Sequence, residues 1–202
     1  IIMSKKIRKK VLILAMIGAT VSLNAQNWVN LFNGKNLNDW EIKQGSADYE
    51  IDGNELIGVS KFGTKSTYLC STTQYNDFIL EVDVKIDVRI NSRIQFRSYF
   101  DENYKGGEVR GYQAEIDVDK RRWSGGIFDQ SRRGWIYPVT MNEPGQEAFV
   151  NGAWNAYRIE AIGNTIRTWV NGVQVANLVD NMTAEGFIAL QVHMIKNKEP
   201  VS

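Results

Sequence analysis

Short segments in which polar and apolar residues alternate recur along this chain, and they constrain its fold more than any other feature. The clearest is Ile79–Ile86, where Glu81, Asp83 and Lys85 alternate with aliphatic residues. Successive side chains of a β-strand point to opposite faces of the sheet, so a strand here would gather its charges on one face. The pattern predicts a half-exposed antiparallel strand.

Similar segments recur at short intervals after residue 26, and helical periodicity is hard to find there. The predicted strands are Tyr49–Ile51, Glu55–Val59, Tyr68–Cys70, Phe78–Ile86, Arg93–Tyr99, Tyr112–Val118, Gly126–Asp129, Trp154–Ile162, Thr165–Val170 and Phe187–Val192. Asp52-Gly53-Asn54, Gly163-Asn164 and Asn171-Gly172 predict hairpin turns, because glycine and asparagine supply positive φ. Regular short strands with such turns predict an all-β fold, an antiparallel β-sandwich or jelly roll, rather than a parallel α/β sheet.

The segment 1–25 has the layout of a secretory signal peptide. A basic run after Met3 precedes the apolar stretch Val11–Leu23, and small residues surround Ala25. The apolar stretch is shorter than the roughly 20 residues of a membrane-spanning helix, which argues against a retained anchor. We expect cleavage near Ala25 and a secreted or periplasmic bacterial protein, with no membrane contact after cleavage.

The segment 26–202 is long enough for one domain with a sizeable core. The whole chain has a net charge of +1, and because the predicted signal removes five basic residues, the remaining domain carries about −4. A mildly acidic exported domain is a poor candidate for binding nucleic acid. Cys70 is the only cysteine, so no intramolecular disulfide forms, and its apolar neighbours predict a buried thiol.

Three of the predicted strands carry polar side chains on one face, where solvent alone does not require them. A strand over Arg93–Arg97 places Arg93, Gln95 and Arg97 together, and a strand over Gln113–Val118 places Gln113, Glu115 and Asp117 together. Leu190–His193 adds Gln191 and His193, the only histidine. If the three strands are neighbours, their polar surface could bind a hydroxyl-rich molecule and move its protons.

Two tryptophans, Trp123 and Trp135, lie in a segment rich in glycine and arginine that also contains Arg133. An indole ring in a loop beside a polar face suits stacking on the apolar face of a sugar ring. Plain packing of the loop is the alternative for both rings.

Several short motifs follow one another along almost the whole predicted domain. They are Leu31-Phe32-Asn33-Gly34-Lys35-Asn36-Leu37, Asp39-Trp40, Asn91-Ser92, Phe96-Arg97, Gly111-Tyr112-Gln113 with Glu115 and Asp117, Trp154-Asn155, Arg158-Ile159, Asn171-Gly172 and Gly186-Phe187-Ile188-Ala189-Leu190-Gln191-Val192-His193. In order and spacing they resemble the 3-keto-disaccharide hydrolase domain family. The resemblance implies a jelly roll of the concanavalin A-like lectin/glucanase type.

The chain departs from the family pattern in two places. Asn91-Ser92-Arg93 stands where the family usually has Asn-Ser-Gly, so a large cation replaces a position of close backbone approach. The family also adds one more strand after the segment that contains His193, whereas this sequence stops at Ser202. The expectations therefore include a domain that lacks its last strand, with an unpaired sheet edge.

The resemblance implies a substrate oxidised to a ketone at C3 of a sugar, which acidifies the hydrogen at C2. A base can then remove that hydrogen, the C1 oxygen can leave, and water can add. His193 suits the base, since its unperturbed pKa is about 6.5, and Arg97 suits stabilisation of the enolate oxygen. Glu115 and Asp117 are candidates for supplying the acid, or for holding a divalent cation together with His193. The substrate-binding candidates are Gln95, Gln113, Trp123, Arg133 and Gln191.

Other functions stay open at this point. A non-catalytic carbohydrate-binding module shares the implied fold and would not need His193. A retaining glucanase is a weaker alternative, because a regular strand separates Glu115 from Asp117 by about 7 Å and from Asp119 by about 13 Å, against the 5–5.5 Å needed. The carboxylates could also be the solvated side of a strand. The linkage that is cleaved, the choice between hydrolysis and elimination, and the oligomeric state are not predicted.

Overall fold

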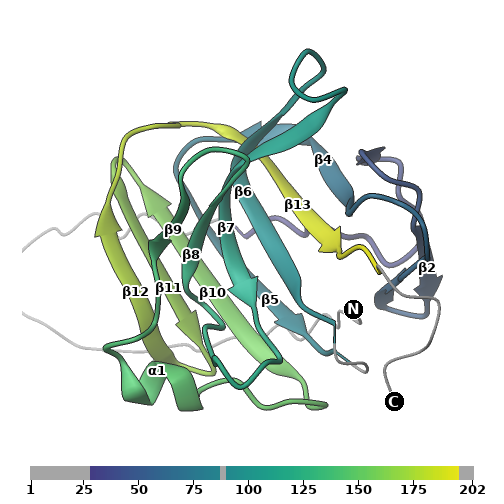
Figure 1. Cartoon of the computed structure of the whole chain (residues 1–202). Coiled ribbons are helices and arrows are strands. Elements are labelled where there is room, and N and C mark those ends of the chain that lie inside the picture. The colour runs from purple at the N-terminus through teal and green to yellow at the C-terminus, as the bar shows by residue number, and fades with distance from the viewer. Residues whose placement is uncertain (1–27, 87–89, 196–202) are drawn as a thin grey trace, which may run out of the picture.

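The computed structural model describes residues 28–86 and 90–195, and there the chain forms an antiparallel β-sandwich (Figure 1). The larger sheet has the order β1 (Trp40–Lys43), β4 (Thr67–Tyr75), β13 (Gly186–Val192), β6 (Ser92–Asp101), β7 (Glu108–Ile116), β8 (Ile127–Gln130) and β9 (Gly134–Tyr137). The smaller sheet has the order β12 (Val173–Val179), β11 (Thr165–Val170), β10 (Asn155–Ile162) and β5 (Phe78–Val84). The predicted all-β sandwich is confirmed. The predicted signal peptide and the chain after Ile195 lie outside the described residues.

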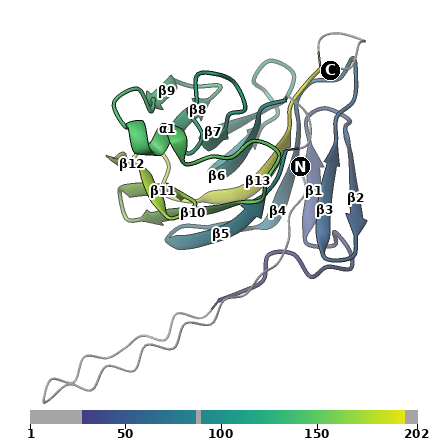
Figure 2. The same ribbon diagram turned by 90° about the horizontal axis from the view of Figure 1, so that it is seen from below.

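The two sheets stack face to face, and their inner faces supply the main hydrophobic core (Figure 2). The larger sheet contributes alternate residues such as Ile94, Ala114 and Leu190, and the smaller sheet contributes residues such as Val84 and Ile159. β5 shows the alternation predicted for it, because Leu80 and Val84 are buried in this core while Glu81 is exposed. Apolar burial along one face of each sheet therefore holds the two layers together.

The predicted hairpin turns are all present. Asp52-Gly53-Asn54 joins β2 (Asp48–Asp52) to β3 (Glu55–Val59), Gly163-Asn164 joins β10 to β11, and Asn171-Gly172 joins β11 to β12. Four elements are not predicted by the sequence pattern: β1, β9, β12 and the short helix α1 (Glu143–Glu147). β1 and β9 have four residues each, too few to show a period, and the alternation of β12 is interrupted by a register shift against β11.

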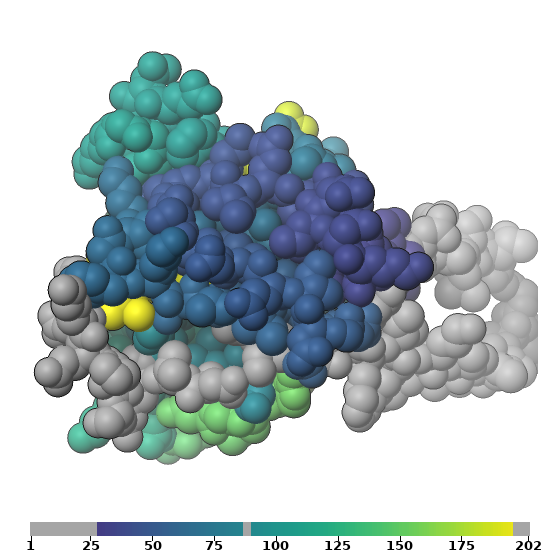
Figure 3. Space-filling model, turned by 90° about the vertical axis from the view of Figure 1, so that its right-hand side faces the viewer, coloured from purple at the N-terminus to yellow at the C-terminus, as the bar shows by residue number. Residues whose placement is uncertain are grey.

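The β2–β3 hairpin packs against the inner side of the larger sheet. Its Leu56 belongs to the main core, and the Tyr49 hydroxyl donates to the Leu190 carbonyl at 2.8 Å. Figure 3 shows that the N-terminal part of the described chain forms most of this side of the molecule, with the β6–β7 turn projecting above it. The hairpin thus extends the layer formed by the smaller sheet.

A β-bulge interrupts β6 at Arg97 and Ser98, where the register shifts against both β7 and β13. Arg97 adopts a φ of 44°, in the left-handed region that residues other than glycine rarely occupy. Gly111 lies opposite, and a Cβ there would come within 2.7 Å of the Ser98 Cα, so only glycine fits. Because a bulge adds a residue to one strand, side chains beyond Phe96 no longer follow the alternation set by Arg93 and Gln95.

The face of the larger sheet that points away from the smaller sheet is called the outer face below. It carries the polar residues that alternate with the core residues of β6, β7 and β13. In the described ranges, no helix is long and apolar enough to cross a membrane. Cys70 is buried, as predicted, and it lies on the outer face. Burial raises the pKa of its thiol to about 12.

Candidate functional site

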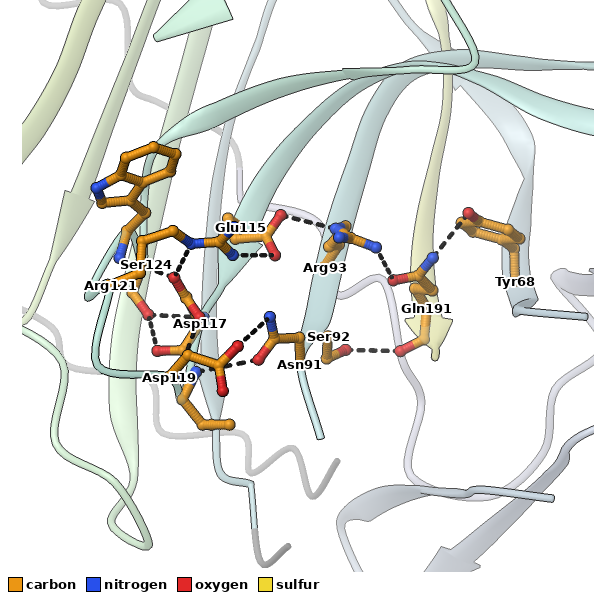
Figure 4. A network of polar contacts seen from close by, with 12 residues as sticks. Tyr68, Asn91, Ser92, Arg93, Glu115, Asp117, Asp119, Arg121, Ser124 and Gln191 are labelled. Carbon is orange, nitrogen blue, oxygen red and sulfur yellow. Dashed lines mark hydrogen bonds and ion pairs between the residues drawn. The ribbon is translucent and has the colours of Figure 1, made fainter. Parts of the chain in front are cut away.

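A row of hydrogen bonds crosses four strands on the outer face (Figure 4). Arg93 Nε donates to Glu115 Oε2 at 2.7 Å, and Arg93 Nη1 donates to Gln191 Oε1 at 3.1 Å. Gln191 Nε2 then donates to the Tyr68 hydroxyl at 2.7 Å. Cross-strand pairing aligns these residues, since Gln191 lies opposite both Tyr68 and Arg93, and Arg93 lies opposite Glu115. Arg93, which departs from the family pattern, is therefore the centre of the row.

Glu115 has an unusual environment for a carboxylate. Its side chain is fully buried, and this burial raises the pKa of the carboxyl group although the charge of Arg93 acts in the opposite direction. Oε2 accepts from Arg93, whereas Oε1 is buried with no hydrogen-bond partner among the described residues. Arg121 Nη2 lies 3.8 Å from Oε1, which is too far for a hydrogen bond. Glu115 thus has one held oxygen and one that can accept a proton or a hydrogen bond.

Asp117 organises the loop that follows β7. Its Oδ2 accepts from Arg121 Nε at 2.8 Å and from the Trp123 N–H at 3.0 Å, and its Oδ1 accepts from the Asp119 N–H at 3.1 Å. The Ser124 hydroxyl donates to the Asp117 carbonyl at 3.0 Å and closes the loop. Because these donors engage both carboxylate oxygens, the geometry gives Asp117 a positioning role.

The loop held by Asp117 brings an aromatic cluster to the same end of the outer face. The Trp123 and Trp135 rings pack edge to face with centroids 4.8 Å apart, and Phe128 packs on Trp135 at 5.3 Å. The Arg121 guanidinium carbon lies 5.0 Å from the centre of the Trp135 ring, and the Arg93 one lies 5.7 Å from that of Phe128. Apolar rings and charged donors therefore lie side by side next to Glu115.

Gln95 and Gln113 lie opposite each other on β6 and β7. Both side chains are fully buried on the outer face, two cross-strand pairs from Arg93 and Glu115, which makes them the next pair on the same face. The structure therefore brings together Gln95, Gln113, Glu115, Gln191 and Trp123 of the predicted site residues, and it adds Arg93, Arg121 and Tyr68. Pairing of Arg93 with an acidic residue on the neighbouring strand was the signal that could have identified Arg93 from the sequence.

Arg97 does not belong to this group, and the prediction that it shares a face with Arg93 and Gln95 is wrong. Its guanidinium donates to the carbonyls of Asn76, Gly163 and Ala161 at 2.8, 2.7 and 3.1 Å, and to Asp77 at 3.0 Å. Asn76 and Asp77 lie in the β4–β5 turn, Gly163 lies in the β10–β11 turn, and Ala161 lies near the end of β10. The bulge at Arg97 turns its side chain towards the other sheet. There its hydrogen bonds link the β4–β5 turn to the β10–β11 turn.

Arg133 is also absent from the outer face, contrary to the prediction that it covers the site. It forms ion pairs with Asp129 and, at 2.7 Å, with Asp180 of the β12–β13 connection. Tyr112, a residue of the main core, donates to the same Asp180. Burial alone would raise the pKa of Asp180, but Arg133 and Tyr112 outweigh it and lower this pKa to about 2. Arg133 therefore links the β8–β9 turn to the opposite layer.

His193 lies just beyond β13. The pairing of β13 with β6 ends at Val192 and Ser92, and His193 follows as the next residue, outside the paired strands. The His193 Nδ1 lies 2.9 Å from the Met194 carbonyl oxygen, so Nδ1 is the donor of that pair. His193 therefore lies at the end of β13, directly after the strand that carries Gln191.

A divalent cation held by Glu115, Asp117 and His193 does not fit this arrangement. Among the described residues, no three histidine, cysteine, aspartate or glutamate side chains are grouped closely enough to hold a metal ion. Arg93 and Arg121 contact the two carboxylates, and their positive charges oppose a second cation there.

Jelly-roll sandwiches recur among lectins, and indole rings beside hydrogen-bonding groups suit the two faces of a sugar. The fold and the outer face define a carbohydrate-related β-sandwich. The chain belongs to the family described as the 3-keto-alpha-glucoside-1,2-lyase-like domain, whose sequence model matches residues 27–201. This match confirms the resemblance stated from the motifs. No curated protein sequence matches the chain.

Solved structures with the same fold include a proposed glycosyl hydrolase from Parabacteroides distasonis, with a TM-score of 0.60 and 15% identity over 81% of this chain and 86% of that chain. The carbohydrate-binding module CBM66 from Bacillus subtilis has a TM-score of 0.55 and 21% identity, over 77% and 88% of the two chains. A galectin-like protein of unknown function from Bacillus subtilis has a TM-score of 0.54 and 10% identity, over 77% and 83%. At these identities the similarity shows the fold.

Proposed function

We propose that this protein cleaves 3-keto-glycosides on the outer face of its larger sheet, by elimination followed by addition of water. The observation that carries the proposal is the environment of Glu115. Its carboxyl group is buried and has a raised pKa, and one oxygen accepts no hydrogen bond from the described residues while Arg93 holds the other. These are the properties of a group that moves a proton, and family membership supplies the substrate class.

In this proposal Glu115 Oε1 removes the proton from C2 of the keto sugar. The electrons of that C–H bond form an enolate whose charge lies on the C3 oxygen, and the nearby guanidinium groups of Arg93 and Arg121 stabilise it. The enolate then re-forms the ketone as the bond between C1 and the leaving oxygen breaks. A raised pKa makes the ionised Glu115 a stronger base than an exposed carboxylate.

The leaving oxygen must gain a proton. We assign this step to the doubly protonated form of His193, the residue that follows β13, in place of the base role expected from the sequence: Nε2 gives its proton to the leaving oxygen while Nδ1 keeps its bond to the Met194 carbonyl. Addition of water across the new C1–C2 double bond completes a net hydrolysis. The aromatic cluster of Trp123, Trp135 and Phe128 offers a surface for the apolar face of the sugar. Because an export signal is predicted from the sequence, we expect this activity in the periplasm or outside the cell.

The test is release of p-nitrophenol from a p-nitrophenyl 3-keto-glucoside by the purified domain. We expect Glu115→Gln to lower kcat by about 10²–10⁴-fold, since glutamine preserves the shape but cannot accept a proton. Glu81→Gln is the matched control, because Glu81 is exposed on β5 and pairs with Arg158 far from the outer face. An active Glu115→Gln variant would contradict the proposed mechanism.

A non-catalytic carbohydrate-binding module is the second candidate, and its supporting observation is the shared fold with CBM66. A binding module needs the aromatic cluster but no proton-transfer group. It predicts that the wild-type chain releases no product from any keto-glycoside, and that Glu115→Gln binds methyl α-glucoside as tightly as the wild type.

A further inference from the structure

Unpartnered polar atoms are concentrated at one place on the outer face. Seven buried side-chain nitrogen and oxygen atoms lack a hydrogen-bond partner among the described residues, and five of them belong to Gln95, Gln113 and Glu115. All four amide atoms of the two glutamines are in this group. Buried polar groups in folded proteins are nearly always hydrogen-bonded, so a cluster of exceptions requires an explanation.

The three residues form one continuous patch. Gln95 and Gln113 are direct cross-strand partners, and Glu115 follows Gln113 by two residues on the same face of β7. Gln191 on the same face differs from them. It is equally buried, yet its amide oxygen accepts from Arg93 and its amide nitrogen donates to Tyr68. The outer face can therefore satisfy a buried glutamine, and it does so where the amide has a structural role.

We propose that Gln95 and Gln113 form a subsite for two hydroxyl groups of one sugar ring, next to the proton-transfer group Glu115. This inference rests on the proposed function, because it names the part of the ligand that this patch recognises. Each amide offers a donor and an acceptor, and each sugar hydroxyl can both donate and accept. Two neutral amides suit an uncharged polyol, whereas an anion would need cationic partners.

The chemistry of the reaction indicates which hydroxyl groups these are. C1 carries the leaving oxygen, C2 loses its proton, and C3 carries the ketone, so all three positions are used by the reacting groups. C2 keeps its own hydroxyl, whereas the hydroxyls at C4 and C6 of a glucoside ring lie away from the departing groups and are available for recognition. Gln95 and Gln113 are the next cross-strand pair on the same face as Glu115, so they can hold these hydroxyls while C2 faces the carboxylate. The two amides are specificity-determining residues in this arrangement.

Such a subsite reduces the stability of the ligand-free protein, and this gives the first test. Replacing a buried, unpartnered amide by an apolar group of similar shape removes an unmet desolvation cost. We expect Gln95→Met and Gln113→Met each to raise the Tm of the ligand-free protein by about 2–4 °C. Gln191→Met is the matched control and should lower the Tm by a similar amount, because it removes two existing hydrogen bonds.

The second test uses the p-nitrophenyl 3-keto-glucoside and its 4-deoxy and 6-deoxy analogues. We expect Gln95→Met and Gln113→Met to reduce kcat/KM for the parent substrate by about 10-fold each, mainly through KM. With the wild-type protein, kcat/KM for each deoxy analogue should be lower than that for the parent substrate by a similar factor. With the variant that lacks the amide bound to the missing hydroxyl, the deoxy change should lower kcat/KM little further.

The outcomes separate this inference from the proposed function. Turnover by the wild type together with an unchanged kcat/KM in both methionine variants would overturn the subsite and leave the proposed function intact. No turnover by the wild type would overturn the proposed function, and the Tm comparison would then decide the subsite. A fall in Tm for Gln95→Met and Gln113→Met, as in Gln191→Met, would show that the amides have structural partners and would overturn the inference.

Discussion

Arg93 and Glu115 face each other on neighbouring strands, and the guanidinium Nε donates to the carboxylate at 2.7 Å. Arg93 is 15% exposed at its side chain, whereas Glu115 is fully buried, so the cation lies on the solvent side of the pair. The same guanidinium also binds Gln191. Arg93 thus opposes the effect of burial on the Glu115 carboxyl group and joins Glu115 to the row that ends at Tyr68.

Removal of Arg93 should therefore cost stability through Glu115. We expect Arg93→Met to lower the free energy of unfolding by about 3 kcal/mol at pH 7, because it leaves a buried carboxylate without its nearest cation. The cost should shrink in the double variant Arg93→Met with Glu115→Gln, in which no buried charge remains. Urea unfolding of both single variants and the double variant measures this coupling. Additive losses would show that the pair does not interact.

The pH dependence of stability should carry a signature of Glu115. Burial raises its folded-state pKa above the unfolded value of about 4.3, so between these values the folded protein keeps a proton that the unfolded chain has lost. The contribution of Glu115 to stability is thus complete below the unfolded value and declines as the pH rises through the folded value. Subtracting the unfolding free energies of Glu115→Gln from those of the wild type between pH 3 and pH 8 isolates this decline. A difference that grows in favour of the wild type with rising pH would contradict the environment described for Glu115.

Arg97 should be structural despite its place in a predicted catalytic strand. Its guanidinium joins the β4–β5 turn to the end of β10 and the β10–β11 turn through four acceptors. We expect Arg97→Met to lower the free energy of unfolding by about 2–4 kcal/mol, because three backbone carbonyls lose a charged donor. At a temperature where the variant is folded, KM for the keto-glucoside should equal that of the wild type. A raised KM in a folded Arg97→Met variant would return Arg97 to the binding site.

The link between Arg133 and Asp180 should protect the fold at acid pH. The folded-state pKa of Asp180 is about 2, below the unfolded value of about 3.9. Its stabilising contribution is therefore present above the unfolded value and is lost as the pH falls towards 2. We expect Asp180→Asn to have a lower Tm than the wild type at pH 6. The difference in Tm between the two proteins should be smaller at pH 2. Asp48→Asn, at an exposed position of β2, is the control and should show no such narrowing.

The aromatic cluster should contribute to sugar binding through Trp135. We expect Trp135→Ala to weaken binding of methyl α-glucoside by about 3- to 10-fold, since it removes one ring of the surface beside Glu115. Trp169→Ala is the matched control, because Trp169 lies on β11 beside Arg158, away from the outer face. Equal effects of the two substitutions on affinity would show that Trp135 acts through stability alone.

The polar face shows which side-chain positions a local alternation pattern can predict and which it cannot. Alternation correctly placed Gln95 on one face of β6, and Gln113 and Glu115 on one face of β7, because successive side chains of a regular strand must alternate. The same rule failed at Arg97, two residues further along β6. A bulge there depends on how β7 and β13 pair with β6, and Gly111 and Ser98 meet only in the folded sheet.

Partnership was equally inaccessible from the sequence. Asp117 looks like a member of the polar face, yet the loop closed by Ser124 brings backbone and Arg121 donors onto its carboxylate. Arg133 looks like a loop residue above the site, yet Asp180, distant in the sequence, draws it to the opposite layer. The Arg133 contact joins residues 47 positions apart, and the Asp117 contacts depend on how the loop after β7 closes, so no local period encodes either.

The sequence by itself determined most of the strands, the hairpin turns, the alternation of polar and apolar faces within regular strands, and the family. These follow from properties that repeat over a few residues: side-chain alternation, turn chemistry and motif order. The tertiary structure alone decided that Arg93 rather than Arg97 contacts Glu115, and that Gln191 is satisfied while Gln95 and Gln113 are not. The physical reason is that the packing of the whole sheet sets strand register, bulges and burial. A shift of one residue in register moves a side chain from one face of the sheet to the other.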